Sequence, residues 1–164
     1  MSGNFQFQTG VPCGIGTGND TAGVGEVGSF GCGSEGEFYT LNGTPKLLKN
    51  FAGFGGNGGK WFSTTNPDGS ATFTAPPANT FVHEPGIRDS VYQPGFQNWN
   101  LNMKKSFAIN EKTGFDFKVD AYNFINHPNW AGPSLNPTAG TFGRVTAKTT
   151  SNPRQLQAGL SFRF

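Results

Sequence analysis

The sequence has little sulfur, little charge and no long apolar run, and each of these shortages excludes a class of protein. It contains 2 Met and 2 Cys, and its 12 Lys and Arg and 10 Asp and Glu are spread over 164 residues. Spread charges exclude the clustered basic surface with which proteins bind nucleic acid. No run reaches the roughly 18 apolar residues of a transmembrane helix. A transmembrane β-barrel would show no such run, because its strands are about ten residues long and only half apolar.

Aromatic residues and backbone-breaking residues are abundant instead. The chain contains 17 Phe, 25 Gly and 11 Pro. Aromatic side chains favour pleated sheets, while Gly and Pro favour turns and loops. No segment carries a sustained apolar stripe with helical period, so helix should be minor. The composition predicts an all-β protein with long loops.

The end of the chain alternates strictly between apolar and polar residues, which predicts a strand with one apolar face. A strand in a soluble sandwich would alternate in the same way. The apolar positions are Leu156, Ala158, Leu160, Phe162 and Phe164. The polar positions are Gln155, Gln157, Gly159, Ser161 and Arg163.

Two further strands are predicted at residues 98–109 and 115–125, joined by a short Gly-ended turn at 110–114. Lys105 is the single interruption of the apolar face of the first of them. A fourth, shorter alternation, with Phe5 and Phe7 on one face, opens the chain. The apolar positions of the two longer strands are Trp99, Leu101, Met103, Phe107, Ile109, Phe115, Phe117, Val119 and Ala121.

The connections alternate between long and short. The predicted division is a strand at 1–9, a Gly-rich loop at 10–97 with a small hairpin near 60–75, and three strands at 98–164 with a loop at 126–152. Outer-membrane barrels have short periplasmic turns and long extracellular loops. If the chain ends in the periplasm, the turn at 110–114 also lies there and both long segments lie outside.

Several segments resemble TonB-dependent receptors of the Oar-like type, which carry a carboxypeptidase-regulatory-like domain. Residues 94–101 (PGFQNWNL) and 105–107 (KSF) resemble the antepenultimate barrel strand of that family, and residues 117–130 (FKVDAYNFINHPNW) resemble the penultimate strand with its Asn-rich outer end. Residues 142–145 (FGRV) and 153–164 (PRQLQAGLSFRF) are similar to the last loop and terminal strand, and residues 3–12 resemble an earlier strand. The similarity covers about half of the chain.

The resemblance implies the C-terminal part of an antiparallel, up-and-down transmembrane β-barrel in the outer membrane of a Gram-negative-type bacterium. It implies an assembly signal, read by the barrel-assembly machinery, formed by Leu156, Ala158, Leu160, Phe162 and Phe164. The apolar faces of the strands would contact lipid, and Trp99 and Trp130 would belong to an aromatic girdle. The expected partners are the remaining barrel strands, the plug of a longer receptor, and lipid.

The N-terminus and the strand number support a segment rather than a whole transporter. Residues 1–4 have neither the basic region nor the apolar stretch of a signal peptide. About four strands cannot close a barrel, which needs at least eight. The alternative is an exported, extracellular β-protein that pairs its strand edges with copies of itself as a fibre or oligomer. A soluble binding module is a third interpretation, weakened by the small core that four strands would bury.

No motif predicts an enzyme, a metal site or a cofactor. Residues 23–28 fit a dinucleotide-binding glycine pattern but lack the flanking strand and helix. Residues 16–20 weakly resemble one calcium-binding repeat, which leaves a single surface calcium open. Asp116 and Asp120 share a polar strand face with Lys118, which alternating charge explains. Cys13 and Cys32 favour a disulfide over free thiols, since an exported loop usually pairs its cysteines.

Overall fold

A computed structural model describes residues 1–33, 35–51, 58–83, 86–149 and 153–164. The described residues form strands, turns and loops, and none of them forms a helix that is long and apolar enough to cross a membrane. The chain divides into two compact units. The first comprises Met1–Thr9, Gly95–Asn129 and Thr149–Phe164, and we call it the membrane sheet after the location that the sequence predicts for it. The second, the loop unit, comprises Gly10–Pro94 and Trp130–Lys148.

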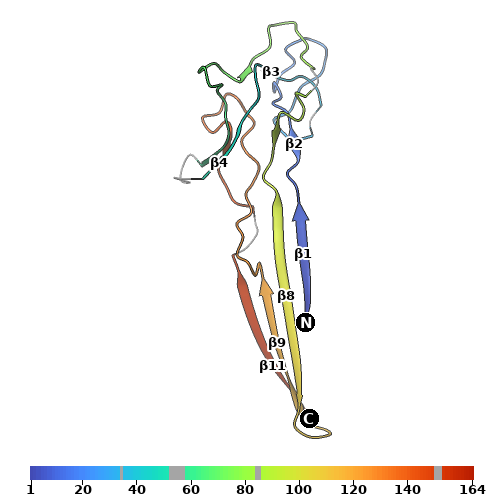
Figure 1. The fold of residues 1–164 in the computed structure, drawn as a ribbon. Helices are drawn as coiled ribbons and strands as arrows, with labels where there is room; N and C mark the ends of the chain where they lie inside the picture. The colour runs from blue at the N-terminus through green and yellow to red at the C-terminus, as the bar shows by residue number, and fades with distance from the viewer. Residues whose placement is uncertain (34, 52–57, 84–85, 150–152) are drawn as a thin grey trace. The chain divides into compact units, whose positions relative to one another are not determined.

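The membrane sheet consists of four antiparallel strands in the order β1-β8-β9-β11. Figure 1 shows these strands running side by side as the long arrows of the fold. Their bounds are Ser2–Gln8 for β1, Phe96–Ala108 for β8, Gly114–Tyr122 for β9 and Gln155–Arg163 for β11. The prediction of an all-β, antiparallel protein is confirmed.

The turn between β8 and β9 is closed by the side chain of Asn110. Its Oδ1 accepts hydrogen bonds from the backbone N–H groups of Lys112 at 3.0 Å and Thr113 at 2.7 Å. An Asn side chain that binds the backbone two or three residues ahead stabilises a tight turn. The backbone N–H of Ile109 donates to the carbonyl of Thr113 at 2.9 Å. Ile109, which the alternation had placed in a strand, therefore lies in the turn.

Strand β9 ends earlier than the alternation predicted. It stops at Tyr122, whereas the sequence pattern continued to Ile125. Asn123 and Asn126 both adopt left-handed backbone angles, with φ of 46° and 54°. Asn tolerates this conformation better than most residues, so a left-handed Asn ends the extended strand.

The loop unit contains three small sheets. Figure 1 labels three of their short strands, β2, β3 and β4. β10 (Arg144–Val145), β5 (Gly59–Phe62) and β4 (Leu47–Asn50) form one sheet in that order. β2 (Pro12–Cys13) pairs with β7 (Val91–Tyr92), and β3 (Thr40–Leu41) pairs with β6 (Phe73–Thr74).

The loop unit has an apolar core of its own. Its largest cluster of buried side chains is centred on Trp61, Phe62 and Phe73, and a smaller cluster surrounds Phe38. The remaining members are Cys13, Ile15, Val91, Leu135 and Val145 in the first cluster, and Val82 and Ile87 in the second. Val145 lies in the segment between β9 and β11, so the two segments that the sequence separates as loops share one core.

The hairpin near residues 60–75 is a short one. Thr65 bridges Ala71, and the N–H of Thr72 donates to the carbonyl of Thr64 at 3.0 Å, around a turn at residues 66–70. Farther from the turn the two arms separate, because β5 pairs with β4 and β10 while β6 pairs with β3. The arms thus join different sheets of the loop unit.

Candidate functional site

The register of the membrane sheet brings the apolar residues of all four strands onto one face. Met103 lies across from Val119, which lies across from Ala158. Directly paired residues in an antiparallel sheet point to the same side. This apolar face carries Phe5, Phe7, Trp99, Leu101, Met103, Lys105, Phe107, Phe115, Phe117, Val119, Ala121, Leu156, Ala158, Leu160 and Phe162. Of the residues predicted to contact lipid, only Ile109 lies outside a strand.

The apolar face is largely uncovered in the structure. Phe5, Phe7, Met103, Phe107 and Phe117 are all exposed, between 36% and 63%. A soluble monomer rarely leaves a continuous apolar surface of this kind open to water. The face therefore requires an apolar environment, either lipid or another protein surface.

Aromatic contacts reinforce both ends of the apolar face. At the end near the start of β8, the ring of Trp99 meets Phe5 at 4.8 Å and Phe7 at 5.4 Å, edge to face. At the opposite end Phe107 stacks on Phe115 at 4.7 Å, and Phe115 lies 6.1 Å from Phe162. Aromatic residues at both boundaries are typical of a membrane-spanning sheet.

Trp130 does not join this arrangement. It belongs to the loop unit, where its ring stacks on Phe51 at a centroid distance of 4.1 Å and an interplanar angle of 8°. The prediction that Trp130 contributes to an aromatic girdle is therefore wrong. Its position directly after the penultimate strand had suggested the girdle, but its side chain packs against the core of the loop unit.

The opposite face of the sheet carries ion pairs and amides. Lys104 Nζ lies 2.9 Å from Asp116 Oδ2, and Lys118 Nζ lies 2.9 Å from Asp120 Oδ2. The side-chain amide of Asn102 also donates to the carboxylate of Asp120. Asp116 and Asp120, which share a strand face, are thus engaged by neighbouring cations, an arrangement that suits a hydrated lumen.

Asn side chains cap the end of the sheet opposite the turn at 110–114. Asn129 is 1% exposed, and it pairs with the backbone of Gln97: its Oδ1 accepts from the N–H at 2.9 Å and its Nδ2 donates to the carbonyl at 2.8 Å. Asn123 does the same for His127, at 3.0 and 3.3 Å. These amides take the place of a neighbouring strand, so they satisfy backbone groups where the ladder stops.

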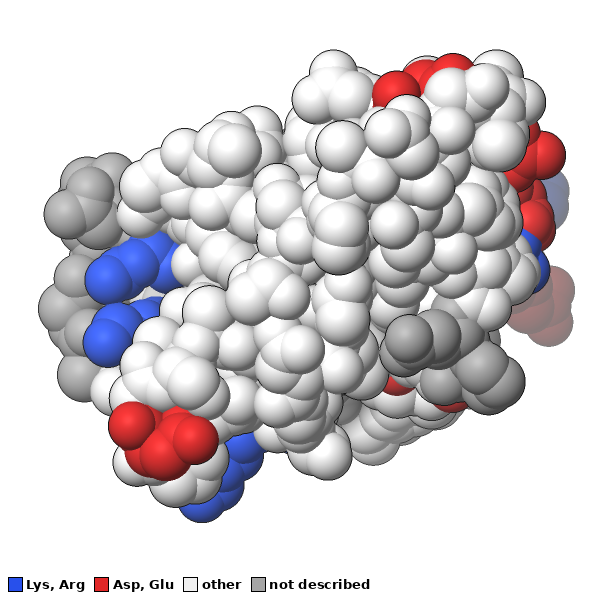
Figure 2. Space-filling view, turned by 90° about the horizontal axis from the view of Figure 1, so that it is seen from above, with Lys and Arg blue, Asp and Glu red and all other residues white. Residues whose placement is uncertain are grey.

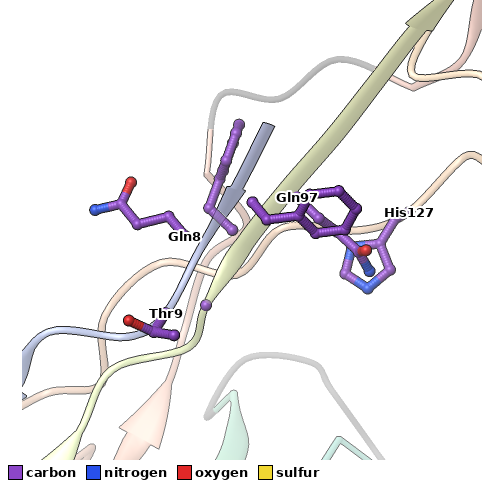
Figure 3. A pocket seen from close by; sticks show the side chains of 7 residues that line it. Gln8, Thr9, Gln97 and His127 are labelled. Carbon is purple, nitrogen blue, oxygen red and sulfur yellow. The ribbon is translucent and has the colours of Figure 1, made fainter. Parts of the chain in front are cut away.

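A pocket opens at this rim of the sheet, between the end of β1 and the start of β8. Figure 3 shows Gln8 and Thr9 on one side of it and Gln97 and His127 on the other. Its volume is about 420 Å³, and Phe7, Gly95 and Phe96 complete the lining. His127 Nδ1 is buried and has no hydrogen-bond partner among the described residues. The rings and amides around this pocket can contact a ligand.

The terminal strand places the five predicted signal residues along one edge of the sheet. Strand β11 pairs with β9 only, so its other edge has no partner strand among the described residues. Leu156, Leu160 and Phe162 are 57–66% exposed, and Phe164 is fully exposed just beyond the strand. An unpaired edge with exposed apolar side chains is competent to add another strand.

Cys13 and Cys32 form a disulfide in the loop unit, with an S–S distance of 1.93 Å and a Cα–Cα distance of 4.2 Å. Cys13 is completely buried in the core of the unit. The bond links the first residues of the loop unit to the Gly-rich stretch that follows. It fixes a segment for which the sequence pattern predicts no regular element.

Glu37 is a structural site that the sequence analysis missed. Its side chain is 0% exposed, and its carboxylate accepts hydrogen bonds from the N–H of Thr21 at 2.7 Å, the N–H of Ala22 at 2.8 Å and the hydroxyl of Thr21. Burial acts to raise the pKa of Glu37, but these hydrogen bonds outweigh it and hold the pKa below its ordinary value of 4.5. Glu37 is one of three Glu residues in this Gly-rich segment, with Glu26 and Glu35, and the sequence gives no local signal that it would be the buried one.

The Gly-rich segments show no ligand cluster. No group of three or more His, Cys, Asp or Glu side chains that could hold a metal ion exists among the described residues. In the segment that weakly resembles a calcium repeat, the Asp20 carboxylate accepts the N–H groups of Val24 at 3.0 Å and Gly25 at 2.8 Å. The backbone bond from Gly25 dominates in lowering the pKa of Asp20. Figure 2 shows a face on which Lys, Arg, Asp and Glu lie near the margins and uncharged side chains predominate.

Comparison with known proteins agrees with the architecture of the sheet. A family model described as an outer membrane beta barrel domain matches residues 1–157, which is nearly the whole chain. No curated protein and no solved structure matches the sequence. The predicted location, the cell outer membrane, is confirmed by the family. With its antiparallel strands and single apolar face, this chain belongs to the outer membrane β-barrel domain family.

Proposed function

We propose that the chain forms part of the barrel wall of a TonB-dependent receptor of the Oar-like type, with a structural and substrate-contacting role rather than a catalytic one. The observation that carries the proposal is the register of β1, β8, β9 and β11, which gathers the apolar side chains on one face and the ion pairs on the other. In a barrel these faces contact lipid and the aqueous lumen respectively.

The receptor type is supported by the segments that resemble that family. The strand that begins at residues 94–101, the Asn-rich end of residues 117–130 and the terminal strand correspond to β8, β9 with its Asn caps, and β11. The loop unit and the pocket at the outer rim then face the outside, where a receptor first meets its substrate. The plug and the remaining strands would be partners in the assembled receptor.

The terminal strand is proposed as the assembly signal. Removing Phe162, Arg163 and Phe164 should abolish insertion of the receptor into the outer membrane, because it removes the aromatic end of the apolar face. The measurement is the fraction of folded receptor in isolated outer membranes, from its altered gel mobility without heating. The control replaces the polar-face residues Ser161 and Arg163 with Asn and Gln. Normal insertion of the truncated form would contradict the signal role.

The receptor assignment needs a separate experiment. An antibody against the loop unit should detect these residues in the outer membrane within a polypeptide far longer than 164 residues, and that polypeptide should cross-link to TonB. Detection of the same residues in a short chain that forms regular soluble assemblies would instead favour the second candidate, a self-assembling exported β-protein. In the described part of the chain, β1 and β11 each have one edge without a partner strand, and this is the observation in favour of that candidate.

A further inference from the structure

Lys105 stands out on the apolar face. Among the described residues on that face, it alone carries a charge. It lies directly across from Phe117, and Leu160 lies across from Phe117 on the next strand. A Lys in the middle of a lipid-facing surface is costly, and the cost falls toward the membrane boundary. Its presence therefore needs a reason.

The charge of Lys105 has no opposite charge beside it in the described structure. Lys105 is exposed and has no carboxylate partner among the described residues, and its Nζ lies 5.1 Å from the centroid of the Phe107 ring. Its neighbour Lys104 points to the opposite face and pairs with Asp116 at 2.9 Å. Two adjacent lysines at the same level of the sheet thus have different surroundings. Lys104 has an anion within the protein, whereas Lys105 has aromatic and aliphatic neighbours.

The position of Lys105 along the strand sets its depth. It lies two residue pairs before the row formed by Phe107, Phe115 and Phe162, and β8 ends at Ala108. At roughly 3.3 Å per residue, the backbone of Lys105 is about 10 Å from the end of the strand. A Lys side chain can extend along apolar neighbours until its ammonium group reaches the polar boundary. The short turn at this end is of the kind that faces the periplasm.

We propose that Lys105 binds the phosphate of an anionic phospholipid in the periplasmic leaflet of the outer membrane. The ammonium group contacts the headgroup, while Phe107, Phe117 and Leu160 pack against the acyl chains. This inference rests on the proposed function, because that function directs the apolar face to lipid. It adds a specific lipid site to the barrel wall and fixes the depth of the sheet in the membrane.

The test measures the thermal unfolding of the receptor barrel that contains this chain, folded in phosphatidylcholine vesicles with and without phosphatidylglycerol. Binding to the folded state alone raises the midpoint, and a single basic contact with anionic lipid should raise it by about 1 °C in a barrel several times longer than this chain. Lys105→Leu should lose this increment, and Lys105→Arg should keep it. Inorganic phosphate added to phosphatidylcholine vesicles should give no increment, because the acyl chains are part of the site.

Lys104→Leu is the matched control. It removes a Lys at the same depth but on the opposite face, so the midpoint itself falls while the phosphatidylglycerol increment remains. An increment that survives in Lys105→Leu, or is absent from the unchanged chain, would overturn the lipid site while leaving the barrel intact. Failure of the receptor that contains this chain to insert into either kind of vesicle would overturn the proposed function and the site with it.

Discussion

The membrane sheet and the loop unit use apolar side chains in opposite ways. In the loop unit the largest apolar residues turn inward, so that Trp61 and Phe62 are only 6% and 2% exposed. In the membrane sheet they turn outward, and Leu156 and Phe162 are each 66% exposed. One unit carries its own core, while the other depends on its surroundings for one. The difference shows that a single chain can contain two kinds of stability, of which only one depends on lipid.

The largest expected loss of stability comes from a substitution that creates a cavity in the loop unit. Phe62 packs against Phe142 at 5.6 Å and Phe73 at 6.1 Å. Phe62→Ala should therefore destabilise the loop unit by about 3–5 kcal/mol, the usual cost of emptying a buried Phe site. Hydrogen–deuterium exchange of the intact protein should show faster exchange in the loop unit and unchanged exchange in the membrane sheet.

Phe107→Ala is the matched control for this prediction. The same side chain is removed, but from the exposed apolar face, where Phe107 is 38% exposed and no buried cavity results. The exchange of the loop unit should not change. If the two substitutions slowed or accelerated exchange equally in both units, the comparison between an internal and an external core would be wrong.

Reduction of the disulfide should have the next largest effect. Cys13 and Cys32 are separated by 19 positions, and opening a loop of that size costs about 3 kcal/mol in the chain-entropy description. A reducing agent should thus lower the unfolding midpoint of the loop unit in denaturant. Insertion of the sheet into the membrane should be unaffected, and a defect in insertion under reducing conditions would show that the two units are not independent.

An arginine placed on one or the other face of β11 tests whether the apolar face of the membrane sheet is the one that contacts lipid. Ala158→Arg puts a charge on the apolar face near the middle of the sheet and should destabilise the inserted barrel by about 2 kcal/mol or more. Gln157→Arg puts the same charge one residue away, on the face of Asp120, and should be tolerated. The measurement is the amount of folded protein in outer membranes for each of the two variants. Equal yields would mean that the face assignment is wrong.

Acid should have the smallest effect, confined to the loop unit. Because the pKa of Glu37 is lower in the folded state, its contribution to stability is complete above pH 4.5 and disappears as the pH falls through the folded pKa. The unfolding midpoint should fall between pH 5 and more acidic values. Glu37→Gln should reduce this slope without abolishing it, since Asp20 and Asp68 also have lowered pKa values. A slope unchanged by the substitution would exclude Glu37 as its source.

The sequence was informative where structure is local. Alternation with period two predicted the strands and the faces of the membrane sheet, because neighbours along a strand decide which side each residue points to. It could not predict the core of the loop unit, since Ile15, Phe38, Trp61 and Val145 follow no common period and meet only after folding. The prediction that Trp130 belongs to an aromatic girdle failed for the same reason, because its stacking partner Phe51 lies far away in the sequence.

The role of the buried Asn residues could be predicted from the sequence only in part. An Asn-rich segment after β9 was visible in the sequence, and its Asn residues cap the end of the sheet opposite the turn at 110–114. The sequence could not show that Asn129 would pair with Gln97, or that Asn123 would pair with His127. Those contacts depend on how the chain turns after the strand, and the left-handed angles at Asn123 and Asn126 decide that turn.

The pairing of Gln8 with Phe96 affects which insertions the segment between β1 and β8 can tolerate. The chain leaves the sheet at the end of β1 and returns directly beside it at the start of β8, so the long intervening segment begins and ends at neighbouring points. Doubling the length of a flexible loop anchored in this way costs only about 0.6 kcal/mol. The junction of β1 and β8 is therefore a point at which residues can be inserted at small cost in free energy, whereas an exchange of the whole loop unit would also have to replace residues 130–148, which share its core.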